Sequence, residues 1–223
     1  MDTVEYAAGR QADIFGDPAH PTVLIWHGMQ TDSRTAVRLL AEFVADHSLS
    51  VIAADWNAHA ADRGRSDLLQ SLRFAQQRMG PAESLTLVGW SMGGLAAAGL
   101  TLQAARHDVR LRHTVCLAGA FTAPDPISGR APAAALVDAE RRSPFTLLHG
   151  IADDVLPVAV SRQFATELER HGWPVEVVEL DADHGSIAGA RYDPVGDKYH
   201  AADDPATMAI AEDVAARIAA VSR

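Results

Sequence analysis

Residues 84–94 read Ser-Leu-Thr-Leu-Val-Gly-Trp-Ser-Met-Gly-Gly. The apolar run at 85–88 is typical of a buried strand, and the small residues that follow it favour a helix. Between them, Gly89 and Gly93 flank Ser91 in the pattern G-x-S-x-G, a sharp strand-to-helix turn that exposes a serine hydroxyl. Side chains at the two glycine positions would collide with the neighbouring elements. This stretch therefore predicts a strained turn that carries a nucleophilic serine at the start of a helix.

The rest of the chain alternates short apolar runs with amphipathic stretches, which is typical of a parallel sheet covered on both faces. The runs predict strands at 4–7, 12–15, 22–26, 51–54, 85–88, 114–118, 145–148 and 175–180, and the stretches predict helices at 33–47, 66–79, 92–106, 158–171 and 204–221. A break at Gly9 favours an opening hairpin. We therefore expect one α/β domain over residues 1–223, with a short, irregular, lid-like insertion at 119–143.

The composition limits the classes of function. With 223 residues, 48% of them hydrophobic and 22% charged, the chain is large enough to bury one core. A formal net charge of −10 at pH 7 argues against nucleic-acid binding, which needs a basic surface. The start of the chain lacks the features of a secretory signal, and no apolar run reaches membrane-spanning length, so we expect a cytoplasmic protein. The single cysteine, Cys116, lies in an apolar stretch and is expected to be a buried thiol.

A serine hydroxyl is a weak nucleophile, so it needs a base within reach and an acid that orients the base. His184 follows the last predicted strand, at the sheet edge where ligands gather in open α/β sheets. Asp153 and Asp154 follow the preceding strand, and both are candidates for the acid. We favour Asp153, because the Val155-Leu156-Pro157 stretch after it would open the next helix.

Acyl transfer also needs two backbone N–H groups that stabilise a developing oxyanion. The strand at 22–26 ends in the loop at 27–30, which reads His-Gly-Met-Gln. Gly28 allows the backbone to turn the Met29 amide inward, while the Met92 amide opens the helix after the serine. We expect these two amides to form the oxyanion hole.

The remaining histidines show no metal-ligand pattern. His27 is expected to brace the oxyanion loop, His149 to be packed before the acid loop, and His59 to lie in a loop. The chain also lacks the glycine-rich sequences that bind nucleotides. We expect neither a metal nor a cofactor.

In their order of serine, acid and histidine, these motifs resemble the α/β-hydrolase superfamily over about residues 22–185. The resemblance implies an eight-stranded, mostly parallel sheet with an antiparallel second strand, helices on both faces and a small or absent cap at 119–143. The residues at 56–59 read Trp-Asn-Ala-His, which departs from the Arg-Gly-His-Gly pattern of many lipid-directed relatives. The substrates of those relatives are therefore not carried over.

The resemblance also implies a catalytic role for five positions. Ser91, Asp153 and His184 match the catalytic triad of the superfamily, and Met29 and Met92 match its oxyanion amides. A serine esterase or thioesterase is the nearest description, with a carboxylic ester of short to medium acyl chain as the expected small-molecule substrate. Amidase or peptidase activity or hydroxynitrile lyase chemistry on the same triad, and a non-catalytic scaffold that binds a small molecule, remain alternatives.

Further residues are expected to contact the substrate. Four candidates are expected to line an open cleft: Gln30, Trp90, Phe121 and Ile187. The segment 186–203 either connects to the last helix or shapes the substrate pocket, as long ordered loops often do.

Overall fold

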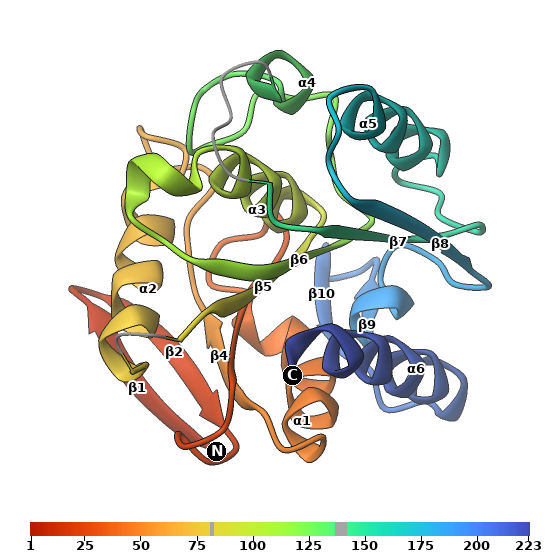
Figure 1. Ribbon diagram of the computed structural model, residues 1–223. Coiled ribbons are helices and arrows are strands. Elements are labelled where there is room, and N and C mark those ends of the chain that lie inside the picture. Colours follow the sequence, from red (N-terminus) through yellow and green to blue (C-terminus); the bar gives the residue numbers. More distant parts are fainter. Residues whose placement is uncertain (81–82, 137–141) are drawn as a thin grey trace.

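Eight strands form the central sheet of the protein, whose computed structural model describes residues 1–80, 83–136 and 142–223. The strands are β1 (Asp2–Ala7), β2 (Arg10–Phe15), β3 (Thr22–Trp26), β4 (Ser50–Ala54), β5 (Leu85–Trp90), β6 (Leu111–Leu117), β7 (Phe145–Gly150) and β8 (Val175–Leu180). They lie in the order β1-β2-β4-β3-β5-β6-β7-β8 (Figure 1). The eight strands expected from the sequence are confirmed.

Strand β2 runs against its neighbours, since it pairs antiparallel with both β1 and β4. The pairs from β4 to β8 are parallel. The β1–β2 hairpin turns at Gly9, whose φ of 70° favours glycine. Every residue of β3, β4, β5 and β7 is buried, because the parallel part of the sheet is covered on both faces. The mostly parallel sheet with an antiparallel second strand is thus confirmed.

Helices cover both faces of the sheet. They are η1 (Arg34–Val37), α1 (Arg38–Asp46), α2 (Arg65–Arg78), α3 (Met92–Leu102), η2 (Ala104–His107), α4 (Pro132–Ala135), α5 (Ala159–Arg170), η4 (Ser186–Ala188) and α6 (Pro205–Ser222). Helices α2, α3 and α5 pack on one face, and α1 and α6 on the other (Figure 1). Small residues dominate α3, so it lies close to the sheet and is buried from Gly93 to its end.

A short hairpin outside the main sheet was not predicted. Strands β9 (Ala190–Asp193) and β10 (Lys198–Ala201) pair antiparallel within the segment 186–203. The hairpin contacts η1 and is drawn on the α1 and α6 side of the sheet in Figure 1. Four residues per strand are too few for a clear alternating pattern, which explains why the sequence did not reveal it.

The expected insertion at 119–143 contains one helix, α4, among the residues that the structure describes. Residues 137–141 of this insertion lie outside them. Cys116 lies fully buried in β6, as expected. Within 1–80, 83–136 and 142–223, no helix is both long enough and apolar enough to cross a bilayer.

Candidate active site

Ser91 lies in a strained turn between β5 and α3. Its φ of 55° and ψ of −116° are rare for a residue with a side chain. A Cβ atom at Gly93 would lie 2.3 Å from the carbonyl oxygen of Trp26, and one at Gly89 would lie 2.1 Å from that of Gly93. The turn is tied to the next strand, since the Ser91 amide donates to Leu117 O over 2.9 Å. Both glycines are therefore required by close backbone approach, for the reason that the sequence suggested.

His184 pairs with a buried carboxylate. Its Nδ1 lies 2.8 Å from Asp153 Oδ2, and the side chains of both residues are almost inaccessible to solvent. The other carboxylate oxygen, Oδ1, accepts hydrogen bonds from the amides of Val155 (2.9 Å) and Leu156 (2.8 Å). With Asp153 ionised, the Nδ1–H of His184 donates to it, which leaves Nε2 as the basic nitrogen of a neutral ring.

A second histidine also contacts this carboxylate. His149, at the end of β7, lies with its Nε2 2.9 Å from Leu156 O and 3.3 Å from Asp153 Oδ2. Both of these oxygens are acceptors, so Nε2 carries the ring proton, and Nδ1 accepts from the Ser161 hydroxyl over 2.7 Å. His149 is buried, as expected, but its contact with the acid was not predicted.

Electrostatics keep the Asp153 carboxyl ionised. Burial alone would raise its pKa, but hydrogen bonds from His149, His184 and the Leu156 amide hold that pKa well below its usual range. Asp154 instead lines an adjacent groove. Of the two candidate acids, it is Asp153 that lies against the histidine.

Ser91 and His184 open onto the same small cavity of about 200 Å³. The cavity is lined by Gly28, Met29, Gln30, Ser33, Trp90, Ser91, Val155, His184, Tyr192, Asp197 and Tyr199. Among the lining residues, Met29, Val155 and Tyr192 are large apolar or aromatic residues that are also exposed to solvent. The lining is mostly apolar, and Ser91 and His184 are the lining residues whose types fit a nucleophile and a base.

Two of the four expected substrate contacts line this cavity. Trp90 lines the cavity, and its indole Nε1 donates to the backbone oxygen of His184 over 2.7 Å. Gln30 does so while its side-chain amide is bound to the β9–β10 hairpin: Nε2 donates to Asp197 O over 2.8 Å, and Oε1 accepts from the Tyr199 amide over 2.9 Å. The side-chain amide of Gln30 therefore binds the backbone of the β9–β10 hairpin.

The other two expected contacts, Phe121 and Ile187, do not line this cavity. Phe121 stacks on Phe164 of α5, with ring centroids 4.2 Å apart, and lines a separate hollow beside that helix. Ile187 is completely buried in the core between the sheet and α6. Phe121 follows the end of β6 and Ile187 follows His184 in the sequence, but the side chains of both pack against other parts of the protein. Val155, Tyr192 and Tyr199 line the cavity in their place.

The loop after β3 lies directly against the serine. A Cβ atom at Gly28 would lie 3.5 Å from Ser91 Cβ and 3.4 Å from the Trp90 ring. Met29, the next residue, lines the cavity, and Met92 begins α3 immediately after the serine. Two backbone segments thus flank Ser91, which is the arrangement that an oxyanion hole needs.

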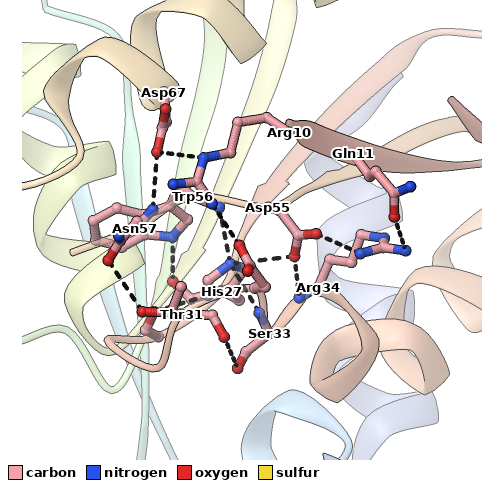
Figure 2. A network of polar contacts seen from close by, with 12 residues as sticks. Arg10, Gln11, His27, Thr31, Ser33, Arg34, Asp55, Trp56, Asn57 and Asp67 are labelled. Atoms are coloured by element: carbon pink, nitrogen blue, oxygen red, sulfur yellow. Dashed lines mark hydrogen bonds and ion pairs between the residues drawn. The ribbon is translucent and has the colours of Figure 1, made fainter. Parts of the chain in front are cut away.

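His27 is buried beneath this loop (Figure 2). Its Nδ1 lies 2.8 Å from Gly28 O, and its Nε2 accepts hydrogen bonds from the amides of Ser33 (3.3 Å) and Trp56 (3.2 Å). The Trp56 indole donates to His27 O over 3.1 Å. Burial lowers the pKa of His27 to about 3, so the ring is neutral and can accept at Nε2 while it donates at Nδ1. The expectation that His27 braces the loop agrees with these contacts.

An ionic network that the sequence did not reveal continues outward from His27 (Figure 2). Asp55 accepts from the Arg34 amide over 3.0 Å and forms an ion pair with its guanidinium. Arg34 also pairs with Asp13 of β2 over 3.0 Å, so the network ties β2 to η1. These contacts fix the segment 27–34 that borders the cavity. The residues in this network are far apart in the sequence, so no local sequence pattern predicts it.

Comparisons with known proteins agree with this architecture. No family model and no curated protein matches the chain. Among solved structures, esterase 2 from Thermogutta terrifontis with butyrate bound has a TM-score of 0.68 and 17% identity, covering 97% of this chain and 94% of that one. The α/β-hydrolase MGS-M1 from a Medee basin deep-sea metagenome has a TM-score of 0.62 and 14% identity, covering 99% and 96%.

A third similar structure is S-formylglutathione hydrolase from Staphylococcus aureus, with a TM-score of 0.66 and 14% identity, covering 96% of this chain and 90% of that one. At these identities the likeness concerns the fold, and it extends over nearly the whole length of each chain. The strand order, the antiparallel β2 and the position of the Ser91 turn between β5 and α3 all agree with it. The chain therefore has the α/β-hydrolase fold.

Proposed function

We propose that this protein is a serine hydrolase that cleaves carboxylic esters of short acyl chain. One observation carries the proposal: a serine in a strained turn and a histidine paired with a buried carboxylate line the same small, mostly apolar cavity. A hydroxyl, an imidazole and space for an apolar acyl group share one cavity, which supports acyl transfer from an ester. The solved structures of similar fold support it, because esterases are prominent among them.

The reaction begins when Ser91 Oγ attacks the ester carbonyl and His184 Nε2 takes its proton. The imidazolium that forms is stabilised by Asp153, whose carboxylate accepts a hydrogen bond from its Nδ1–H. The Met29 and Met92 amides stabilise the negative charge on the carbonyl oxygen of the tetrahedral intermediate. When the intermediate collapses, His184 Nε2 protonates the leaving alcohol, and the acyl group remains on Ser91.

Water completes the reaction. His184 removes a proton from a water molecule, the resulting hydroxide attacks the acyl carbonyl, and the second tetrahedral intermediate collapses with return of the proton to Ser91. Throughout the cycle Asp153 stays ionised, because its negative charge is stabilised by contacts with His149, His184 and two backbone amides. The carboxylate thus keeps the histidine in one tautomer.

The size of the cavity supports a short acyl chain. Its volume of about 200 Å³ is below the ~300–1,000 Å³ of pockets for drug-sized ligands. The Thermogutta terrifontis esterase of similar fold was solved with propionate and with butyrate bound, both short acids. Acetate, propionate and butyrate esters are the substrates that we expect to be cleaved fastest.

Covalent labelling tests the proposed function. The wild type and the variants Ser91→Ala and Ser66→Ala are incubated with a fluorophosphonate and analysed by intact mass, beside turnover of p-nitrophenyl acetate and butyrate. Ser66 lies exposed on α2, so its variant is a control for loss of a serine remote from the cavity. Labelling and turnover are expected in the wild type and in Ser66→Ala, and neither in Ser91→Ala. A folded wild type that is neither labelled nor active would overturn the proposal.

The chemical class of the leaving group is tested on the same proteins. Matched butyryl ester, thioester and amide substrates share one acyl group, so their relative kcat/KM values report the leaving group alone. We expect the ester and the thioester to be cleaved and the amide to be cleaved much more slowly, because its leaving group must be protonated to depart. An amide rate equal to the ester rate would place the protein among amidases or peptidases.

A further inference from the structure

Two tyrosines of the β9–β10 hairpin face the cavity as a pair. Tyr192 and Tyr199 lie directly opposite each other in the antiparallel register, with ring centroids 5.1 Å apart. Cross-strand partners share one face of a hairpin, so both rings point to the same side. The Tyr192 hydroxyl donates to Asp197 Oδ1 over 2.6 Å, which holds the ring against the turn of its own hairpin.

The tyrosine pair is attached to the catalytic loops. The Tyr199 and Trp90 rings are perpendicular to each other, with centroids 4.9 Å apart. A Cβ atom at Gly185 would lie 3.0 Å from Tyr199 Cε1, so the ring packs on the backbone next to His184. On the other side, the Gln30 amide binds the hairpin backbone at Asp197 O and at the Tyr199 amide. The hairpin is therefore fixed relative to the oxyanion loop and to the histidine.

A larger hollow adjoins the cavity at the tyrosine pair. It measures about 910 Å³, against about 200 Å³ for the cavity at Ser91. Both hollows are lined by Tyr192, Tyr199, Val155 and His184, whereas Ser91 lines the smaller one. The tyrosine pair therefore forms a partition between a small apolar cavity that contains the nucleophile and a wider groove beside it.

We propose that Tyr192 sets the longest acyl chain that the protein accepts, by closing the small cavity toward the wider groove. The inference rests on the proposed function and names its specificity-determining residue. An acyl chain attached to Ser91 extends into the cavity until it meets the tyrosine partition. Butyrate fits in front of it, whereas octanoate would have to displace the ring. Tyr192 is the exposed member of the pair, with 43% of its surface accessible, so its removal opens the partition without emptying the core.

Substitution at Tyr192 tests this assignment. The ratio of kcat/KM for p-nitrophenyl octanoate to that for p-nitrophenyl butyrate is measured for the wild type, Tyr192→Ala and Tyr192→Phe. Phenylalanine keeps the ring and loses the hydroxyl, so it is the matched control. If each added methylene that fits is worth about a factor of ten, the ratio in Tyr192→Ala is expected to rise at least about tenfold, while Tyr192→Phe stays within about threefold of the wild type.

A second variant guards against loss of the hairpin. Tyr192→Leu retains an apolar side chain but shortens it, and is expected to give an intermediate ratio. A ratio unchanged in both Tyr192→Ala and Tyr192→Leu, with melting temperatures close to the wild type, overturns the inference. An equal rise in Tyr192→Phe also overturns it, because the hydroxyl contact rather than the ring would then control chain length.

The two proposals fail in distinguishable ways. If the proposed function is wrong, the wild type is not labelled by the fluorophosphonate and cleaves neither ester. If only the assignment of Tyr192 is wrong, the wild type and Tyr192→Ala are both labelled and both active, with the same preference among acyl chains.

Discussion

The indole Nε1 of Trp90 donates a hydrogen bond to the backbone oxygen of His184, with the two atoms 2.7 Å apart. Trp90 is the residue directly before Ser91, and its ring centroid lies 5.6 Å from that of the histidine. Trp90 therefore ends β5 directly before Ser91, and its side chain fixes the backbone of His184. Any movement of the loop after β8 away from the serine must break this bond.

Trp90→Phe is expected to separate this positioning role from packing. Phenylalanine keeps an aromatic ring but leaves the buried His184 oxygen without its donor, which costs about 1–3 kcal/mol in unfolding free energy. We also expect kcat for p-nitrophenyl butyrate to fall about tenfold or more, because the base is less well placed. The indole N–H of Trp173 has no hydrogen-bond partner among the described residues, so Trp173→Phe is the matched control. A kcat lowered equally in both variants would contradict the prediction.

Asparagine substitution distinguishes the two neighbouring acids. In Asp153→Asn the amide holds the His184 ring in the wrong tautomer, and we expect kcat to fall by about 10⁴, as for the same change in serine proteases. Asp154→Asn changes a residue of the adjacent groove and is expected to keep kcat within about threefold of the wild type, as for surface changes away from the reacting atoms. Steady-state kinetics on p-nitrophenyl butyrate provides the measurement. The reverse order of effects would assign the acid to Asp154.

Acid should destabilise the fold through His27. Its pKa is about 3 in the folded protein, where burial lowers it, and about 6.5 in an unfolded chain. Below pH 6.5 the unfolded state binds the extra proton, so stability is full above that pH and declines as the pH falls toward 3. The slope from one such group is at most about 1.4 kcal/mol per pH unit. Burial also lowers the pKa of His113, to about 4, and adds a contribution of the same sign.

Urea unfolding between pH 7 and pH 4 measures this slope. His27→Gln loses the buried hydrogen bonds of the imidazole, so its unfolding free energy at pH 7 is lower than that of the wild type. Because glutamine takes up no proton in either state, this free energy also falls less steeply with acid. The remaining slope belongs to other titrating groups, among them His113 and His107, whose pKa values burial also lowers. Identical slopes in both proteins would show that His27 is not held neutral in the fold.

Gly93 is expected to tolerate no side chain. In Gly93→Ala the new Cβ would lie 2.3 Å from Trp26 O, a backbone atom that cannot move without disturbing β3. We expect a loss of more than about 3 kcal/mol in unfolding free energy, beyond the range of ordinary overpacking. Gly9→Ala is the control, because its Cβ meets nothing within 4 Å and only its φ of 70° is unfavourable, at about 1–2 kcal/mol. Comparable losses at both positions would contradict the steric argument.

The sequence by itself determined the parts of this protein that depend on neighbours along the chain. Apolar periodicity is a local property, so it located the eight strands and the five longer helices. The turn at Ser91 was equally readable, because the steric demand falls on residues two positions away on either side. His184 was a candidate for the base because it follows the last strand, and the carboxyl ends of parallel strands meet at one edge of the sheet.

Tertiary structure alone decided which side chains meet at that edge. Asp153 and Asp154 are adjacent and chemically alike, and only the direction of the loop puts one of them 2.8 Å from His184. Phe121 and Ile187 lie near site residues in sequence but point into packed protein. Tyr192 reaches the cavity from a four-residue strand, held by a contact to Gln30 more than 160 residues away. Such contacts arise from the packing of distant segments, and packing leaves no pattern in either segment alone.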